Sequence, residues 1–187
     1  MKIGISGVPG SFSEEAARTY ATKHGTPYTS IEPLVSVENV LTALEQDEIQ
    51  LGIFPIENSN GGIVIEAVYA AAKHNFSIEN LFEIEVVMNL LVRKGMTATQ
   101  VERIASHDQA LKQCRMYLKR AWAGADLVPY VDTALAAKDL AEGRLPVGTA
   151  VIASASAAQL YGLDILEEKI QDLKFNYTVF IAATRLP

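Results

Sequence analysis

Polar residues gather in a short stretch, Glu57 to Gly62, that follows an apolar run and precedes a helical pattern. The apolar run, Leu51 to Ile56, is typical of a strand, and the spacing of apolar residues from Ile63 onward predicts a helix. A strand that turns through glycine into a helix start directs unpaired backbone N–H groups toward one spot, and such spots bind anions. An ordinary turn between a strand and a helix uses the same residue types, so this stretch alone leaves both interpretations open.

Further polar clusters stand at predicted strand ends or helix starts: Gly10-Ser11, Ser106 to Gln109, Asp132-Thr133 and Asn176 to Thr178. In a parallel α/β sheet these ends share one edge, so we expect the clusters to converge. Each cluster also has a structural interpretation. Two of them begin or contain helix caps, and the last suits the start of an edge strand. Capping does not exclude contact with a ligand.

Histidine and cysteine offer few candidates for other chemistry. His107 ends a predicted strand and precedes a helix, so a site role and a structural role both stay open. His24 and His74 lie at helix C-terminal ends, where a cation interacts favourably with the helix dipole. Cys114 falls on an apolar helix face, which favours a buried thiol. The sequence has no zinc-site spacing, no Gly-x-Gly-x-x-Gly after a strand and no P-loop, so neither a metal nor a cofactor is expected.

The elements that must position these clusters alternate between strand and helix. Apolar runs predict strands at residues 2–6, 28–31, 51–56, 84–92, 104–106, 127–131, 147–153 and 178–183. Helical periodicity predicts helices that begin near residues 11, 36, 63, 108, 133 and 154. This order predicts an α/β fold with two lobes of mainly parallel sheet and flanking helices.

The pattern changes near Phe76, and the long strand predicted at 84–92 marks a crossing into a second lobe. We expect residues 1–78, completed by 172–187, to form the first lobe and residues 79–171 to form the second, because the last strand is expected to return to the first sheet. Two chain crossings would then act as a hinge. Small ligands usually bind in clefts, so a cleft between the lobes is the expected site. No separate regulatory domain is expected.

Composition restricts the class of partner. The chain has 187 residues, 49% hydrophobic and 20% charged, which is enough for a folded core in one unit or two small lobes. The formal net charge of −6 argues against nucleic acid or an acidic membrane surface, so an anionic substrate must be attracted locally. No apolar segment approaches the roughly 20 residues of a membrane helix, and the start of the chain has no signal-peptide layout. A cytoplasmic protein without a membrane partner is therefore expected.

Six motifs, in order along the chain, resemble those of the catalytic domain of prephenate dehydratase. They are Gly7 to Glu14, Pro55 to Gly62, Ser106 to Cys114, Asp132 to Ala134, Ala150 to Leu163, and Asn176 to Phe180. The resemblance implies a bilobed fold similar to type II periplasmic binding proteins. It also implies a carbon–oxygen lyase that removes carbon dioxide and the ring hydroxyl from prephenate, giving phenylpyruvate in phenylalanine biosynthesis. A small anionic substrate and a homodimer are expected on the same basis.

The resemblance also assigns roles by position. Thr178 matches the threonine regarded as the acid that assists hydroxide departure, and it is the expected catalytic residue. A hydroxyl has too high a pKa to be a strong free acid, so Thr178 is expected to act as a positioned donor. The residues expected to bind substrate are Ser11, Asn58, Ser59, Gly62, Gln109, Thr133 and Asn176, with Glu57, Gly61 and His107 as additional candidates.

The chain departs from the family pattern at several points. Val179 stands where the family's closing motif carries an arginine, and a charge-assisted hydrogen bond of that kind contributes about 1.5 to 3 kcal/mol. Affinity for prephenate would then fall by roughly ten- to a hundredfold. Ile63 follows Gly62 where the family commonly has a serine. The alternatives to a prephenate dehydratase are therefore a cyclohexadienyl-acid binding module, an arogenate dehydratase or a divergent decarboxylase.

Overall fold

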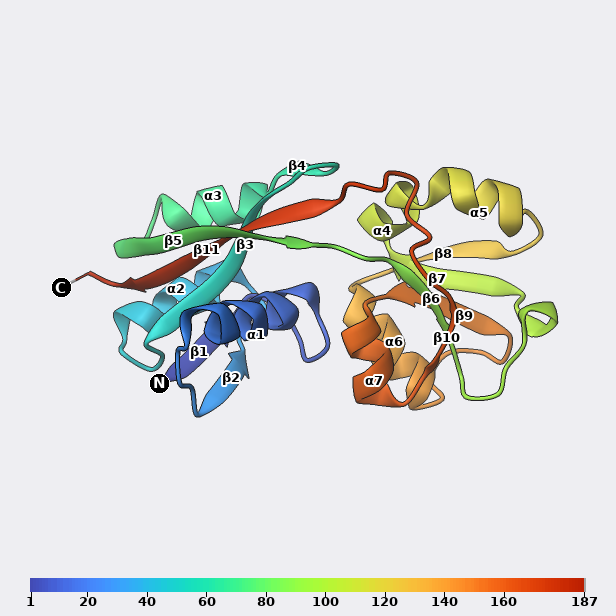
Figure 1. Ribbon diagram of the computed structural model, residues 1–187, viewed down its shortest axis with the longest axis horizontal. Helices are drawn as coiled ribbons and strands as arrows, with labels where there is room; N and C mark the ends of the chain where they lie inside the picture. The colour runs from blue at the N-terminus through green and yellow to red at the C-terminus, as the bar shows by residue number, and fades with distance from the viewer. Residues whose placement is uncertain (187) are drawn as a thin grey trace. The chain divides into compact units, whose positions relative to one another are not determined.

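The computed structural model describes residues 1–186 and separates the chain into two compact units (Figure 1). Unit 1 comprises Met1–Val86 and Phe175–Pro187, of which Pro187 lies outside the described residues, and unit 2 comprises Val87–Lys174. The chain therefore passes between the units twice, after Val86 and after Lys174. Within residues 1–186 no helix has the length and apolarity to cross a membrane.

Unit 1 is a mixed sheet with helices on both faces. Its elements are β1 (Lys2–Ile5), α1 (Phe12–His24), β2 (Ser30–Pro33), α2 (Val37–Glu45), β3 (Leu51–Asn58), β4 (Gly62–Ile63), α3 (Ile65–Ala71), β5 (Phe76–Glu85) and β11 (Tyr177–Arg185). The strand order is β2-β1-β3-β11-β5, with β4 paired to β3. Figure 1 shows β11, in red, between β3 and β5.

The strands of unit 1 are only partly parallel, which corrects the expectation of a mainly parallel sheet. β1 is parallel to β2 and β3, whereas β11 runs antiparallel to β3 and β5. Parallel neighbours need a crossover connection, usually a helix. β11 instead arrives from unit 2, so its direction is not set by a crossover helix within unit 1. Its first residues therefore lie beside the last residues of β3.

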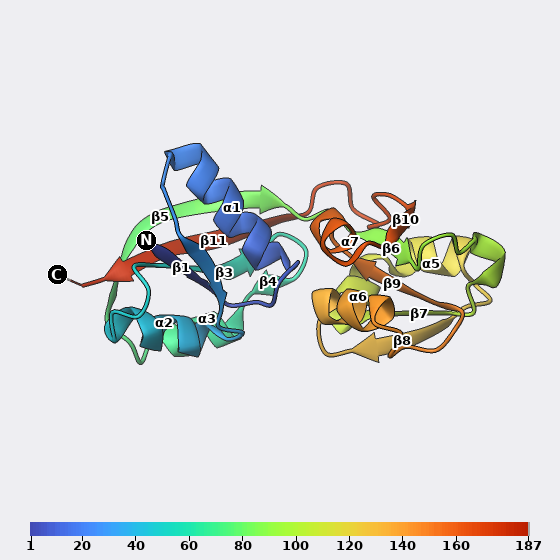
Figure 2. The same cartoon turned by 90° about the horizontal axis from the view of Figure 1, so that it is seen from below.

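Alternate residues of β11 enter two separate hydrophobic clusters, one on each face of the sheet. Phe180 and Ala182 pack on the α1 side, while Ile181 and Ala183 pack on the side of α2 and α3. Figure 2 shows α1 and the pair of helices α2 and α3 on different sides of the strands. This period-two alternation assigns each site residue of the strand to a face.

Unit 2 is built in the same way around a second mixed sheet. Its elements are β6 (Asn89–Val92), the short 3-10 helix Ala98–Gln100, β7 (Arg103–His107), α4 (Asp108–Gln113), α5 (Arg115–Ala121), β8 (Asp126–Tyr130), α6 (Thr133–Ala141), β9 (Thr149–Ala153), α7 (Ala155–Tyr161) and β10 (Asp164–Glu167). The strand order is β10-β6-β9-β7-β8, with β7 parallel to β8 and β9, and β6 antiparallel to β9 and β10. Helices α6 and α7 cover one face of this sheet.

The helix predicted to run on from Asp108 is in fact two helices, α4 and α5, that meet at Cys114. The apolar face continues through the break, because Cys114 and Leu118 are both buried, so periodicity could not reveal it. A carboxylate distant in sequence caps the second helix: Asp172 accepts hydrogen bonds from the backbone N–H groups of Met116 and Tyr117, at 2.8 Å each. That cap satisfies donors which a helix start otherwise leaves unpaired.

The strand predicted at 84–92 was also wrong as a single element. β5 ends at Glu85 and β6 begins at Asn89, so the crossing segment between them is not part of either sheet. β5 itself begins at Phe76, well before the predicted start, and the short strands β4 and β10 were not predicted. β4 has only two residues, and β10, Asp164–Glu167, has a carboxylate at each end, so neither gives much strand signal in isolation.

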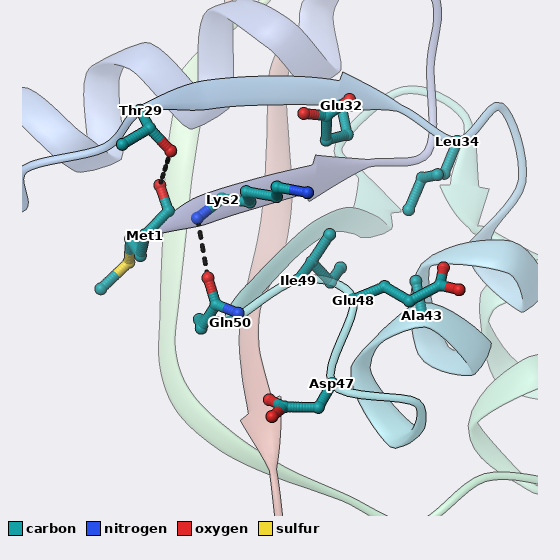
Figure 3. Close-up of a pocket in the computed structure, with 10 residues that line it drawn as sticks. All are labelled: Met1, Lys2, Thr29, Glu32, Leu34, Ala43, Asp47, Glu48, Ile49 and Gln50. Atoms are coloured by element: carbon teal, nitrogen blue, oxygen red, sulfur yellow. Dashed lines mark hydrogen bonds between the residues drawn. The ribbon is translucent and has the colours of Figure 1, made fainter.

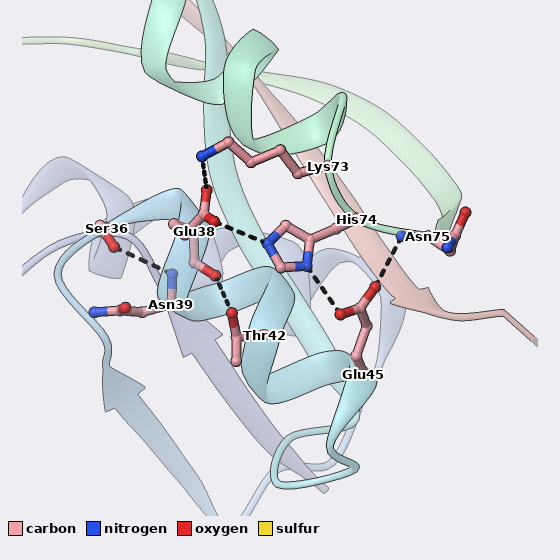
Figure 4. A network of polar contacts seen from close by, with 8 residues as sticks. All are labelled: Ser36, Glu38, Asn39, Thr42, Glu45, Lys73, His74 and Asn75. Atoms are coloured by element: carbon pink, nitrogen blue, oxygen red, sulfur yellow. Dashed lines mark hydrogen bonds and ion pairs between the residues drawn. The ribbon is translucent and has the colours of Figure 1, made fainter.

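A charged cluster that we call the His74 clamp ties α2 to the turn between α3 and β5 (Figure 4). His74 Nδ1 lies 2.9 Å from Glu45 Oε2, and Nε2 lies 3.3 Å from Glu38 Oε1. The Asn75 N–H donates to the other Glu45 oxygen at 2.9 Å, and Lys73 Nζ lies 3.2 Å from Glu38. Both ring nitrogens face carboxylates, so the charged imidazolium fits best. The hydrogen bond to Glu45 is the largest cause that raises the pKa of His74 above 6.5.

Candidate active site

The end of β3 and the start of β11 form one polar edge of unit 1. Because these strands are antiparallel, Asn58 lies directly opposite Thr178, and Glu57 lies opposite Val179. The sequence placed these two segments in separate motifs more than a hundred residues apart. The structure brings them together as neighbours in one ladder.

The turn that follows Asn58 is a hairpin between β3 and β4, rather than a strand-to-helix turn. Asn58 Oδ1 accepts hydrogen bonds from the backbone N–H of Asn60 at 3.0 Å and of Gly61 at 2.8 Å. An Asn side chain that accepts from the backbone two residues ahead is a common turn-forming arrangement. Gly62 has a φ of +78°, a left-handed conformation that favours glycine. The role of Gly61 and Gly62 visible in unit 1 is therefore to make this turn.

The anion-binding cradle predicted from the backbone of this stretch is not formed. The N–H groups of Asn60 and Gly61 already bond to Asn58. The Ser59 N–H donates to the carbonyl of Tyr177 at 2.8 Å, and the Tyr177 N–H donates to Ser59 Oγ at 3.0 Å. Ser59 thus extends the pairing of β3 with β11 by one residue. The prediction failed because it counted N–H donors without the acceptors that the returning strand and the Asn58 side chain provide.

The orientation of the Asn58 amide follows from these bonds. Two backbone donors meet its oxygen, so its nitrogen must face the other way, and the assignment rests on the hydrogen-bond network. Nδ2 donates to Thr178 Oγ1 at 2.8 Å, to Asn176 Oδ1 at 2.9 Å and to the Tyr177 carbonyl at 3.2 Å. Thr178 and Asn176 are buried, with 7% and 0% of their surface exposed.

This amide determines what the hydroxyl of Thr178 can do. Because Thr178 Oγ1 accepts a hydrogen from Asn58, its own hydrogen must point away from that amide. Within residues 1–186 the Thr178 hydroxyl has no protein acceptor for that hydrogen. The arrangement therefore presents a buried hydroxyl that uses one of its two lone pairs to accept from Asn58 and whose proton remains available as a donor.

Val179 lies on the opposite face of the sheet from Thr178. Strand alternation puts Val179 on the side of Ile181, which packs with α2 and α3, and puts Thr178 on the α1 side. The residues opposite Val179 on the two neighbouring strands are Glu57 and Glu83, both exposed. A basic side chain at position 179 would thus be flanked by two carboxylates.

Ser11 stands at the same edge of the unit 1 sheet, after the end of β1. It is 7% exposed and caps α1, because its Oγ accepts from the Glu14 N–H at 3.4 Å. Glu14 does not bond back to the N–H of Ser11, because its carboxylate accepts from the N–H of Gly10 at 2.6 Å instead. A Cβ at Gly7 would lie 2.4 Å from Ser11 Oγ, so this loop requires glycine there.

Unit 2 presents its own polar edge, where the parallel strands β7 and β8 end. His107 caps α4, with its Nδ1 accepting from the Gln109 N–H at 3.3 Å, and both side chains are exposed. Thr133 is the first residue of α6 and half-buried, next to the cap Asp132, which accepts from the Leu135 N–H at 2.8 Å. The three candidates predicted in this unit therefore share one edge of one sheet.

The cavity shown in Figure 3 lies at the other end of the unit 1 strands, where β1 and β3 begin. Its volume is about 680 Å³, and its lining includes Lys2, Glu32, Asp47 and Gln50. None of the predicted site residues lines it. Among residues 1–186, no three His, Cys, Asp or Glu side chains are grouped so as to hold a metal ion.

The two units, each a mixed sheet with flanking helices, place the protein in the α/β class. A nutrient-binding protein from Burkholderia cenocepacia bound to methionine has a similar fold, with a TM-score of 0.52 and 17% identity, covering 99% of this chain and 84% of that chain. At this level of identity the likeness shows the fold alone. The predicted α/β fold class, similar to periplasmic binding proteins, is confirmed.

The chain belongs to the prephenate dehydratase family, whose family model matches residues 3–186. Arogenate dehydratase 1 of Petunia hybrida is 34% identical over 189 residues, covering 100% of this chain and 43% of the relative. The bifunctional chorismate mutase/prephenate dehydratase of Stutzerimonas stutzeri is 31% identical over 181 residues, covering 97% of this chain and 48% of the relative. The chain thus spans less than half the length of these curated relatives.

A solved structure gives the same assignment. The prephenate dehydratase from Arthrobacter aurescens in complex with L-Phe has a TM-score of 0.90 and 28% identity, covering 100% of this chain and 61% of that chain. The family predicted from six sequence motifs is therefore confirmed along nearly the full chain.

Proposed function

We propose that the chain is the catalytic part of a prephenate dehydratase. In this reaction the ring–carboxylate bond of prephenate breaks, and its electron pair enters the ring as carbon dioxide leaves. The ring becomes aromatic as the carbon–hydroxyl bond breaks, and the departing hydroxide takes up one proton to leave as water. The products are phenylpyruvate, carbon dioxide and water, and no oxidant, reductant or cofactor is needed.

The observation that carries the proposal is the hydroxyl of Thr178, which accepts from Asn58 and keeps its proton available. Aromatisation supplies much of the driving force, so the site needs a positioned hydrogen-bond donor more than a strong acid. Thr178 serves this purpose because the Asn58 amide orients its hydroxyl. Water returns the proton after each turnover, since the products carry no proton back to Thr178.

The remaining predicted contacts stay proposals, and the structure supports them unequally. Gln109, His107 and Thr133 present polar groups at one edge of unit 2, which supports contact with an anionic substrate. Ser59, Gly61 and Gly62 shape the turn beside Thr178, and Ser11 caps α1 while standing at the same edge. Glu57 is exposed on the opposite face from Thr178, so it is the weakest candidate among them.

Arogenate is the second candidate substrate, because the Petunia hybrida relative is named an arogenate dehydratase. Arogenate carries an ammonium group where prephenate carries a keto group, and its product is phenylalanine. The two candidates are separated by incubating the protein with each acid and identifying the product by mass. A product that retains the ring hydroxyl would identify a decarboxylase, and ligand-dependent thermal stabilisation without product would identify a binding module.

The decisive variants exchange the Thr178 side chain. Thr178→Val keeps the shape without the hydroxyl, and loss of a general acid typically slows a reaction by about 10²- to 10⁴-fold. Thr178→Ser retains a donor and should retain most of the activity. Thr184→Val is the matched control, because Thr184 lies in the same strand and its hydroxyl donates to Glu79 at 2.8 Å. Equal losses in both valine variants, or no product from the unaltered protein, would overturn the proposal.

A homodimer and a cytoplasmic location are proposed as well. β5 stands at the end of the unit 1 strand order, and its Ile78 and Leu81 are exposed, which supports an apolar contact between copies. Sedimentation of the protein and of its Leu81→Lys variant tests this. The unaltered protein should sediment as a dimer and the variant as a monomer, whereas a dimer formed through a surface other than β5 would not dissociate in the variant. Localisation needs a fluorescent fusion in the source cell, because several plant relatives are named chloroplastic.

A further inference from the structure

Asn176 was predicted to bind substrate, but its surroundings point to another role. It is fully buried, and its side-chain Oδ1 accepts from Asn58 Nδ2 at 2.9 Å. Its backbone carbonyl accepts from the Val86 N–H at 2.7 Å. We infer that Asn176 is a positioning residue that fixes the Asn58 amide and, through it, the Thr178 hydroxyl; this step rests on the proposed function.

The amide nitrogen of Asn58 connects Asn176 to Thr178. Asn58 Nδ2 has two hydrogens, and it donates to Thr178 Oγ1 at 2.8 Å and to Asn176 Oδ1 at 2.9 Å. The third acceptor, the Tyr177 carbonyl, is more distant at 3.2 Å. Acceptors from two different side chains, together with the donors at Oδ1, hold the plane of the amide. If Asn176 loses its oxygen, the amide loses one of these acceptors and is less firmly aligned with Thr178.

The position of Asn176 in the chain strengthens the inference. Val86 is the last residue of unit 1 before the first crossing, and Asn176 is the second residue after the chain returns. Their backbone hydrogen bond therefore joins the outgoing and returning segments within unit 1, next to β11. A residue fixed by its backbone in this way, and buried, holds its side chain at a constant place relative to Asn58. Such a residue suits positioning better than direct contact with a ligand.

Kinetics of two variants distinguish positioning from substrate contact. Asn176→Ala should lower kcat by about two- to tenfold, the equivalent of one net hydrogen bond, while KM stays within about twofold. Asn176→Asp keeps an oxygen toward Asn58 and should recover most of kcat. Asn89→Ala is the matched control, because Asn89 is buried at the first crossing but belongs to unit 2. A rise in KM with kcat unchanged would show substrate contact and overturn the inference.

A second measurement needs neither turnover nor a folded variant. In the unaltered protein without substrate, NMR should show slow solvent exchange for both side-chain amide hydrogens of Asn58. Fast exchange would overturn the inference even if the enzyme is active. Where Asn176→Ala folds, one of these hydrogens should exchange faster, while Asn89→Ala leaves both slow. Slow exchange in a protein that forms no product would instead contradict only the proposed function.

Discussion

Replacing Asn58 with aspartate tests the central hydrogen bond of the site with almost no change in shape. The new carboxylate keeps an oxygen that accepts from the N–H groups of Asn60 and Gly61, at 3.0 and 2.8 Å, so the turn after β3 should persist. The other atom changes from a donor nitrogen to an acceptor oxygen, 2.8 Å from Thr178 Oγ1 in the present geometry. The Thr178 hydroxyl then has a carboxylate to donate to.

The size of the effect follows from the new hydrogen bond. A hydrogen bond to a charged group contributes about 1.5 to 3 kcal/mol. In the proposed reaction Thr178 would have to break that bond before donating to the departing hydroxide, so the barrier should rise by a similar amount and kcat should fall by roughly ten- to a hundredfold. The new oxygen also no longer donates to Asn176 Oδ1. The effect on kcat should therefore exceed that of Asn176→Ala.

The assay is the steady-state rate of product formation from prephenate and from arogenate. Asn60→Asp is the control, since it adds the same charge to the same turn, while the Nδ2 of Asn60 donates to the Phe175 carbonyl at 3.1 Å and not to Thr178. Thermal melts of both variants report whether the turn is intact. Unchanged kcat in Asn58→Asp, or an equal loss in Asn60→Asp, would refute the reasoning.

Three further predictions concern other parts of the chain. The pKa of His74 is raised above 6.5 in the folded protein, so the His74 clamp contributes stability that is fully present below pH 6.5 and is lost as the pH rises through the folded pKa. Melting temperatures from pH 5 to 9 should show this alkaline decline, and His74→Gln should remove it. Val179→Arg should raise the melting temperature, because the arginine would lie opposite two glutamates and each opposite-charge pair stabilises a sheet by about 0.2 to 1 kcal/mol. The same variant should change kcat/KM less than threefold, and a tenfold gain would mean that the arginine reaches the substrate. Burial raises the pKa of Cys114 to about 12, so alkylation at pH 8 should be at least about a hundredfold slower than in the urea-unfolded chain.

The fold class could be predicted from the sequence because alternation of strand and helix is a local property. The limits of α6, Thr133–Ala141, agree with the periodicity because Asp132 and a regular apolar face both mark them. Strand direction could not be predicted, because β11 pairs with β3 across more than a hundred residues. The helix break at Cys114 could not be predicted either, because the residue that caps the second helix, Asp172, lies more than fifty residues further along the chain.

The candidate site shows the same division between local and distant information. Motif order pointed to Asn58 and Thr178 as site residues, and an Asn before glycines is a known turn former. Nothing local indicates that the nitrogen of this amide meets Thr178, because that contact depends on the register between β3 and β11. The same register places Val179 on the other face, so a substrate contact at that position could not be judged from its neighbours in the sequence.

The side chains of Asn58, Asn176 and Thr178 form a hydrogen-bond network without charge, which suits the anionic substrate of the proposed function. The protein has a net charge of −6, and its backbone N–H groups after Asn58 are already bonded. The amide of Asn58 orients the Thr178 hydroxyl without placing a charge beside it, so it does not repel a dianion as a carboxylate in direct contact with Thr178 would. In the proposed reaction aromatisation drives bond breaking, so a neutral donor held in one orientation is sufficient. The requirement on the site is therefore geometric. For this reason Asn58→Asp, which changes a donor into an acceptor of the same shape, should lower activity more than Asn176→Ala, which removes a residue that only holds the amide of Asn58.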